Sequence, residues 1–294
     1  MTRSLDELVT HRMVQVGDIQ LHVAEAGTGP LVLLLHGFPE FWYSWRHQIP
    51  VLAEAGYRVA APDLRGYGQS DKPEGLDGYT VGGLAKDVVG LVSALGEQRA
   101  TIVGHDWGGS AAWLLGMAHP KLVDRLVICN APHPAAFAKS LRDPLQLLRF
   151  SYMAFFQVPV IPEALLGARD AAGLRWFMRA AATRPDAFPD EELDRYAAAW
   201  AEPGALRGAL AYYRAMARAL RDRGDAPESP PIQAPTMAIW GASDKILPLA
   251  LADPGRRRVP DFRLEPVEGA GHFVQADAPD RVNELLLDFL PKPT

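Results

Sequence analysis

An aspartate stands at the centre of Gly-His-Asp-Trp-Gly-Gly, a sequence that could present a nucleophile on a tight turn. Asp106 follows a short apolar run that predicts a buried strand and precedes a run with helical spacing. A sharp turn of this kind exposes the central side chain at a helix N-terminus, where free N–H groups favour negative charge. Gly104 and Gly108 would leave room for neighbouring backbone. A carboxylate nucleophile forms an alkyl ester by displacing oxygen or halide from saturated carbon, and it is poorly suited to cleaving ordinary carboxylic esters.

A second chemical element is the loop His-Gly-Phe-Pro-Glu at 36–40, directly after the apolar run 31–35. Its backbone could supply one donor of an oxyanion hole, the N–H of Phe38, and the N–H of Trp107 could supply the other. Two such donors would stabilise the oxyanion that forms when the carbonyl of an ester on Asp106 is attacked. We expect His36 itself to be a structural hydrogen-bonding residue rather than a base.

Two further polar residues follow predicted strands later in the chain. Asp244 lies just past the strand predicted at 236–240, and His272 lies just past the strand predicted at 261–267. Loops at the carboxyl ends of parallel strands form the usual ligand-binding side of an open α/β sheet. The order nucleophile, acid, histidine predicts that Asp244 orients and charge-balances His272, which activates water as a general base. No pair of histidines has metal-ligand spacing, so we predict no metal and no cofactor.

The elements that must position these residues alternate between strands and helices. Two strands within 13–25 are joined at Gly17-Asp18, a hairpin signal. Beyond them, we predict strands at 31–35, 58–61, 99–103, 122–129, 236–240 and 261–267. We predict helices at 44–55, 80–95, 108–118, near 248–253, and from Pro279 onward. This alternation predicts a parallel sheet with right-handed crossovers, and both α/β stretches must share it to complete one core.

The alternation stops between the two α/β stretches. Residues 132–231 hold no convincing strand, are rich in alanine, arginine, leucine and aromatic residues with helical spacing, and end in the linker-like Pro227-Glu-Ser-Pro-Pro. We therefore predict a core domain of residues 1–131 and 232–294, with a helical cap of residues 132–231 inserted between core strands.

Composition sets wider limits. The 294 residues carry a formal net charge of −5, and the short basic run at 256–258 is expected to be solvated, so no nucleic-acid partner is predicted. Cys129, the single cysteine, excludes an intrachain disulfide and is expected to be buried in a strand. No apolar run approaches the ~20 residues of a membrane span, and the polar N-terminus does not resemble a signal peptide. We expect a cytoplasmic protein, and the sequence leaves the oligomeric state open, with a homodimer as one option.

Four sequence blocks in order resemble the α/β-hydrolase superfamily, specifically its soluble epoxide hydrolase family. They are HGFPE at 36–40, DLRGYGQSDKP at 63–73, GHDWGG at 104–109 and GAGHFVQADAP at 269–279. The resemblance covers nearly the whole chain. It implies an α/β-hydrolase fold with a mostly parallel, eight-stranded sheet flanked by helices and an inserted cap. It also implies conversion of a small apolar epoxide and water to a vicinal diol through an aspartyl ester.

The same resemblance implies a role for two cap tyrosines. Members of the family hold the epoxide oxygen with two phenols, and the matching residues here are Tyr152, in Tyr-Met-Ala-Phe-Phe-Gln, and Tyr213, immediately before an arginine. A phenol suits this task because its pKa near 10 keeps it a neutral donor at pH 7. We expect the substrate pocket to include His36, Pro39, Trp107, Phe156 and Phe273.

Alternative functions remain open at this level. Haloalkane dehalogenases share the aspartate and the following tryptophan but commonly carry asparagine after the His-Gly pair, where this chain has Phe38. Haloacid enzymes acting on fluoroacetate carry arginines after the nucleophile, and the stretch 107–111 has none. A non-catalytic ligand-binding protein of the same fold is disfavoured by the intact set Asp106, Asp244 and His272. A serine esterase is disfavoured because residue 106 is not serine.

Overall fold

Eight strands form one twisted sheet in the computed structural model, which describes residues 4–221 and 230–293. The order across the sheet is β1-β2-β4-β3-β5-β6-β7-β8. The strands are β1 (Thr10–Val16), β2 (Ile19–Ala26), β3 (Leu31–Leu35), β4 (Arg58–Pro62), β5 (Ala100–His105), β6 (Val123–Cys129), β7 (Thr236–Gly241) and β8 (Phe262–Val267). β2 pairs antiparallel with both β1 and β4, and the neighbouring pairs from β4 to β8 are parallel. The predicted mostly parallel, eight-stranded sheet is confirmed.

The centre of the sheet is a continuous apolar layer because its strands are buried on both faces. Every residue of β3, β5 and β7 is buried, as expected of parallel strands covered by helices. Cys129 lies at the end of β6 and is fully buried, as predicted. β6 and β7 pair directly although about a hundred residues separate them, so the two α/β stretches share one sheet.

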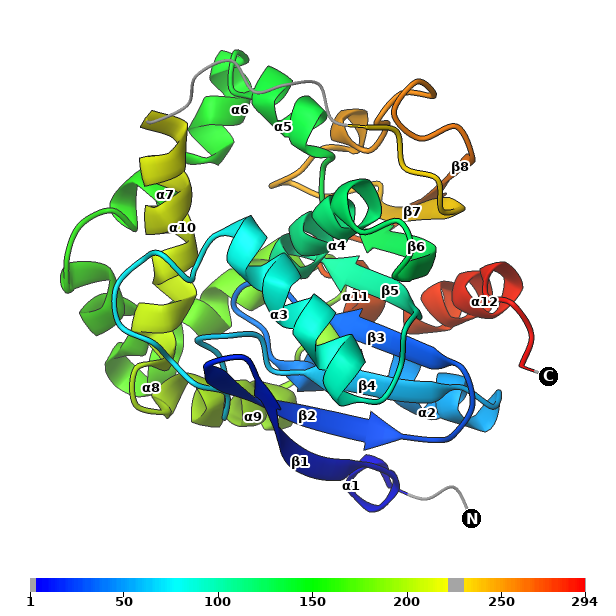
Figure 1. Ribbon diagram of the computed structural model, residues 1–294. Coiled ribbons are helices and arrows are strands. Elements are labelled where there is room, and N and C mark those ends of the chain that lie inside the picture. The colour runs from blue at the N-terminus through cyan, green and yellow to red at the C-terminus, as the bar shows by residue number, and fades with distance from the viewer. Residues whose placement is uncertain (1–3, 222–229, 294) are drawn as a thin grey trace.

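Helices cover the two faces of the sheet. In Figure 1, α3 (Val81–Ala94) and α4 (Asp106–Ala118) lie on one face, and α2 (Gln48–Glu54) and α12 (Pro279–Phe289) lie on the other. Shorter helical elements complete this part of the chain, namely α1 (Leu5–Leu8), the 3₁₀ turns η1 (Trp42–Trp45) and η3 (Leu249–Leu251), and α11 (Val274–Asp277). α12 packs Val282, Leu285 and Leu286 inward, and their helical spacing places them on one apolar face.

All the described elements between β6 and β7 are helical. They are α5 (Pro134–Ser140), α6 (Pro144–Arg149), α7 (Ser151–Phe155), α8 (Ile161–Ala181), η2 (Pro185–Ala187), α9 (Asp190–Ala201) and α10 (Ala205–Arg221). α8 is interrupted at 168–171, where three consecutive residues take positive φ. These helices gather beside the edge at which the parallel strands end (Figure 1). The linker-like stretch predicted at 227–231 lies mostly outside the described residues, which resume at Pro230.

Two helix predictions are wrong in detail, and prolines explain both. The helix predicted at 44–55 is divided into η1 and α2, because Pro50 lacks the N–H that a continuous helix needs there and is tolerated only in the first turn of α2. The helix predicted near 248–253 is a single 3₁₀ turn, since Pro248 and Pro254 bracket the segment and disfavour the α conformation before each of them.

No helix in the described part of the chain combines the length and apolar character of a membrane span.

Candidate active site

The turn between β5 and α4 holds Asp106 in a strained backbone conformation. Its φ is +49°, a region that residues other than glycine seldom occupy and that recurs at functional sites. The turn is tight enough that a Cβ on Gly104 would collide with the backbone of Gly108, and a Cβ on Gly37 would collide with the Asp106 side chain. The glycines are therefore required by the close approach of three backbone segments around one carboxylate.

The two carboxylate oxygens of Asp106 have different surroundings. Oδ1 accepts a hydrogen bond from the backbone N–H of Phe38 at 2.8 Å. Oδ2 lies 3.9 Å from Nε2 of His272. Trp107 follows in the first turn of α4, where backbone N–H groups have no partner within the helix. The structure thus places the two predicted oxyanion donors beside the predicted nucleophile.

His272 and Asp244 form a buried pair. Nδ1 of His272 lies 2.9 Å from Oδ2 of Asp244, and both side chains are almost fully buried. Burial on its own would lower the pKa of His272, but the negative charges of Asp244 and Asp106 outweigh it and raise that pKa to about 9. Burial opposes ionisation of Asp244 too, yet its bonds to His272 and to backbone N–H groups keep its pKa below the ordinary value. The imidazole is therefore a cation held between two carboxylates.

Asn130 is a part of the site that the sequence analysis missed. It directly follows β6, has φ of +43° and is fully buried. Its Nδ2 donates to Oδ2 of Asp244 at 2.7 Å, and its Oδ1 accepts from the N–H of Gly241 at 3.2 Å. The available signal was a polar amide at the carboxyl end of a central parallel strand, the same position that singled out Asp106, Asp244 and His272.

A second buried pair lies behind the nucleophile. Nδ1 of His105 is 2.7 Å from Oε2 of Glu40, and its Nε2 is 2.9 Å from the backbone carbonyl oxygen of His272. Burial would raise the pKa of Glu40, but His105 and the N–H of Gly37 lower it overall. Both ring nitrogens of His105 therefore face acceptor oxygens, one of a carboxylate and one of a carbonyl. This pair fastens the loop 36–40 to the backbone that carries His272.

Two tyrosines of the helical segment line the same cavity as Asp106. Tyr152 comes from α7 and Tyr213 from α10, and their rings pack edge to face with centroids 5.9 Å apart. Tyr213 also packs edge to face on Trp107 at 5.2 Å. Burial, together with the charge of Asp106, raises the pKa of both phenols above their ordinary value. Each phenol therefore stays protonated and able to donate near neutral pH.

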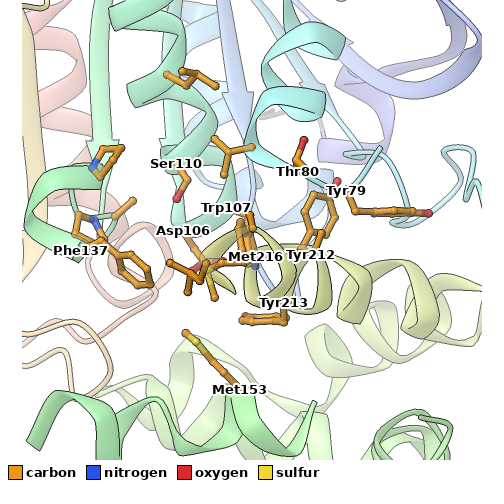
Figure 2. A pocket seen from close by; sticks show the side chains of 18 of the residues that line it. Tyr79, Thr80, Asp106, Trp107, Ser110, Phe137, Met153, Tyr212, Tyr213 and Met216 are labelled. Carbon is orange, nitrogen blue, oxygen red and sulfur yellow. The ribbon is translucent and has the colours of Figure 1, made fainter. Parts of the chain in front are cut away.

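A cavity of 390 Å³ connects these groups. Asp106, Trp107, Tyr152 and Tyr213 all line it, and Asp106 is the single charged side chain among the described residues of its wall. In Figure 2, Asp106 lies between Phe137 on one side and Tyr79 and Thr80 on the other. The rest of the wall is mostly apolar and includes Leu114, Met117, Met153, Met216 and Leu220. The cavity suits an uncharged, apolar molecule that extends to both sides of the carboxylate.

The five residues expected in the pocket divide into two groups. Trp107 lines the cavity, whereas His36, Pro39, Phe156 and Phe273 are buried and do not line it. Nδ1 of His36 faces the carbonyl oxygen of Gly37 and Nε2 accepts from the N–H of Leu64, so its role is structural. Phe156 packs on Phe38, Tyr152 and Tyr213, and Phe273 packs on His105 and His272. Sequence position alone could not separate wall residues from the layer that supports them.

Within residues 4–221 and 230–293, no group of three or more histidine, cysteine, aspartate or glutamate side chains is arranged to hold a metal ion. The chemistry that these residues can perform is nucleophilic attack by Asp106, proton donation by two phenols, and activation of water by the buried histidine.

Comparison with known sequences places residues 30–279 in the family described as alpha/beta hydrolase fold. The chain is 42% identical to the AB hydrolase superfamily protein YfhM of Bacillus subtilis, covering 95% of this chain and 97% of that protein. It is 35% identical to epoxide hydrolase A of Mycobacterium tuberculosis, covering 96% and 97%, and 36% identical to epoxide hydrolase 4 of Mus musculus, covering 98% and 81%.

Solved structures agree with these sequence matches. An epoxide hydrolase of Bacillus megaterium crystallised with an inhibitor superposes with a TM-score of 0.86 at 30% identity, covering 95% of this chain and 99% of that chain. The epoxide hydrolase VrEH1 of Vigna radiata superposes with a TM-score of 0.82 at 31% identity, covering 96% and 98%.

Proposed function

The chain belongs to the epoxide hydrolases of the α/β-hydrolase fold, and from this premise we propose that it opens an epoxide through a covalent ester on Asp106 and releases a vicinal diol. The observation that carries the proposal is the position of one carboxylate. Asp106 lies at the wall of an apolar cavity, 2.8 Å from a backbone donor and 3.9 Å from a paired imidazole. A carboxylate so placed can attack carbon and can later be released by water.

In the first step, Asp106 attacks one ring carbon from the side opposite the epoxide oxygen. The carbon–oxygen bond breaks as the ester bond forms, and the departing oxygen takes a proton from one of the two phenols, Tyr152 or Tyr213. Donation to a developing alkoxide lowers the barrier only if the donor faces the oxygen across the substrate. Both phenols line the cavity wall with Asp106, as this step requires.

In the second step, water attacks the ester carbonyl of Asp106. The oxyanion that develops there accepts from the N–H groups of Phe38 and Trp107. His272 first loses its resting proton to solvent, while the phenolate left by the first step regains one, and the neutral imidazole then takes a proton from the attacking water. The tetrahedral intermediate breaks its bond to the substrate oxygen, which takes the other water proton, so the Asp106 carboxylate, the second hydroxyl of the diol and the protonated imidazole are restored. Ester formation itself readies the base, because it removes the Asp106 charge that helps to raise the pKa of His272. Asp244 keeps the ring oriented throughout.

We further propose that residues 132–231 act as a cap over the sheet, with residues 1–131 and 232–294 as the core. The helices of this segment supply Phe137, Tyr152, Met153 and Tyr213 to the cavity, and the core supplies Asp106. The predominantly apolar wall supports a small, uncharged, apolar epoxide as substrate. Segment 222–229 of the cap lies outside the described residues.

A single turnover in ¹⁸O-enriched water tests the covalent mechanism. With enzyme in excess over a simple epoxide such as styrene oxide, the new hydroxyl of the diol should carry ¹⁶O from Asp106. The peptide containing Asp106 should gain one ¹⁸O, because water attacks the ester carbonyl. Incorporation of ¹⁸O directly into the first diol released would mean that water attacks the epoxide itself, and the ester mechanism would be wrong.

Release of halide is a second candidate function, favoured by one observation. Trp107 lines the cavity, and its buried indole N–H interacts with the phenol of Tyr213 but makes no hydrogen bond of full geometry to any described residue. A donor beside the nucleophile could stabilise a departing halide after attack by the same carboxylate. The test compares two rates for the same protein: halide release from a set of haloalkanes and diol release from epoxides of matched size. The faster reaction shows which leaving group the site prefers.

A further inference from the structure

Large apolar side chains are exposed mainly on one short segment of the helical region. Outside this segment, the exposed large apolar side chains among the described residues are Met13, Trp176 and Leu287. Within it they lie on α6, on α7, on the following loop and at the start of α8. We call this set the apolar patch: Leu145, Leu147, Leu148, Phe155, Val158, Val160, Ile161 and Leu165. Leu148 is 71% exposed and Leu145 is 66% exposed, so most of each side chain faces solvent rather than its own protein.

The patch lies on the outer side of a thin layer over the cavity. α6 and α7 are neighbours at the outer edge of the molecule (Figure 1). From the same layer, Phe137 of α5 and Met153 of α7 point into the cavity that contains Asp106. α6 buries only Gln146, whose side chain donates to the backbone carbonyl of Ile246, and α7 has no fully buried residue. Whatever covers the patch therefore lies one helix layer away from the reacting carboxylate.

Basic side chains surround the patch although the whole chain is acidic. Segment 139–169 carries four basic and two acidic residues, whereas the full chain has a net charge of −5. Lys139, Arg142 and Arg149 are exposed, and none of them forms an ion pair with another described residue. At the other end of the patch, Gln157 shares a surface hollow with three arginines, of which Arg214 pairs with Glu163 and Arg218 with Asp77, while Arg221 is exposed. The charge around the patch is thus complementary to an anionic surface.

We propose that the apolar patch docks on a lipid bilayer that contains anionic headgroups. Leucines next to lysine and arginine suit the boundary between headgroups and acyl chains, since the apolar side chains enter that boundary and the cations meet lipid phosphates. A second copy of the chain fits less well. A two-fold dimer through this patch would place Lys139, Arg142 and Arg149 of both copies at one interface, where like charges repel.

The proposal goes beyond hydrolysis and does not depend on it. Docking through the patch would place the cavity next to the phase in which apolar molecules dissolve. Of the two helices that would then separate lipid from the cavity, α6 buries one residue and α7 buries none.

Binding to vesicles tests the proposal without any substrate. Purified full-length protein is sedimented with sucrose-loaded vesicles of phosphatidylcholine, with or without phosphatidylglycerol. The native protein should sediment with the anionic vesicles and stay in the supernatant with pure phosphatidylcholine. Replacing Lys139 and Arg142 with glutamine should weaken partitioning about fivefold for each charge removed. The double change Leu145→Ser and Leu148→Ser should weaken it at least about tenfold.

A matched control separates the patch from general surface hydrophobicity. The double change Met13→Ser and Leu287→Ser removes two exposed apolar side chains elsewhere and should leave vesicle binding unchanged. Circular dichroism and thermal unfolding, measured for every variant, show that the fold is retained. The proposal is wrong if native protein does not bind anionic vesicles, or if the patch variants bind as well as the control. It is also wrong if light scattering shows a dimer that the leucine changes convert to a monomer, since a second copy would then cover the patch.

Discussion

Nε2 of His272 lies 3.9 Å from Oδ2 of Asp106, a separation that allows charge interaction but exceeds hydrogen-bond distance. The nucleophile therefore keeps one oxygen free of a direct bond, while its other oxygen is fixed by the N–H of Phe38. The opposite side of the imidazole is bonded to Asp244 at 2.9 Å. The carboxylate and the imidazole can therefore act in separate steps, the first attacking the substrate and the second activating water, so changes to each group should affect different steps.

Replacing His272 with glutamine should stop the reaction at the ester. Attack by Asp106 does not need the imidazole, whereas hydrolysis of the ester does, so turnover should fall at least about 10³-fold while ester still forms. Mass spectrometry of the protein after mixing with styrene oxide should show a mass increase equal to one substrate, located on the peptide that contains Asp106. The double variant with Asp106→Ala as well is the control and should show no increase. A single His272 variant that turns over without accumulating ester would contradict the assignment.

Removing the phenol hydroxyls should slow ring opening and spare ester hydrolysis. Tyr152→Phe or Tyr213→Phe alone should reduce the rate of ester formation about tenfold, because one phenol remains. Both changes together should reduce it at least about 10²-fold. Rapid-quench measurement of the ester separates the two steps. Tyr196→Phe, which also removes a buried hydroxyl but lies outside the cavity wall, is the matched control. Equal slowing of epoxide opening and of any halide release would rule out donation to the epoxide oxygen as the role of the pair.

The charge of Asp106 should control the proton on His272. Asp106→Asn keeps the shape of the side chain and removes its charge, so the pKa of His272 should fall below the value of about 9 in the native protein. Asp244→Asn should lower it further, since the charge of Asp244 is the largest one that opposes burial. Titration of the imidazole by NMR measures both shifts. An unchanged pKa in the Asp106 variant would mean that ester formation does not prepare the base.

Stability should depend on pH through the same histidine. Its pKa is about 9 when folded and 6.5 in the unfolded chain, so protonation favours the folded state. The stabilisation that the proton on His272 gives to the folded state is on the order of 3 kcal/mol. It is fully present below pH 6.5 and is lost as the pH rises through about 9. Denaturant unfolding of the native protein should therefore show stability falling over this window more steeply than in His272→Gln. Parallel curves for the two proteins would show that His272 does not hold the extra proton.

Asn130 should stabilise the site through its hydrogen bonds and at the cost of backbone strain. Asn130→Gly removes the bonds to Asp244 and Gly241 and relieves the positive φ, whereas Asn130→Ala removes the bonds and retains the strain. We expect the free energy of unfolding to fall by about 1–3 kcal/mol in Asn130→Gly, because buried polar groups lose their partners. In Asn130→Ala we expect it to fall by about 1 kcal/mol more, because the strained backbone remains. Unfolding by denaturant measures both. If the Asn130→Ala variant were as stable as the native protein, neither the hydrogen bonds of the Asn130 side chain nor its backbone strain would matter to folding.

The alternating pattern of the sequence predicted most of the sheet because a buried strand has a local signal. Apolar runs at 31–35, 58–61 and 122–129 correspond to β3, β4 and β6 within a residue or two. Short helices are harder to predict, since the point at which each one begins depends on whether a proline falls within its first turn, as Pro50 does in α2.

Asp106, Asp244 and His272 were singled out in the sequence because each follows a predicted strand, and parallel strands bring their carboxyl ends to one edge. The distances between them, and the contributions of Asn130, Glu40 and His105, depend on side chains that meet across segments far apart in the chain. The division between Trp107 in the cavity wall and Phe156 or Phe273 outside it depends on packing depth, for which a sequence has no local pattern.

Residue types and their order along the chain by themselves determined a carboxylate nucleophile and an α/β sheet to carry it, because a strained turn and a buried strand each leave a signature in a few consecutive residues. Only the tertiary structure decided that this carboxylate meets an imidazolium, two phenols and an apolar cavity, and that leucines of the helical segment face outward among basic side chains. Those relationships are set by how helices and strands pack at long range, where burial, charge and shape act between residues that are not neighbours in sequence.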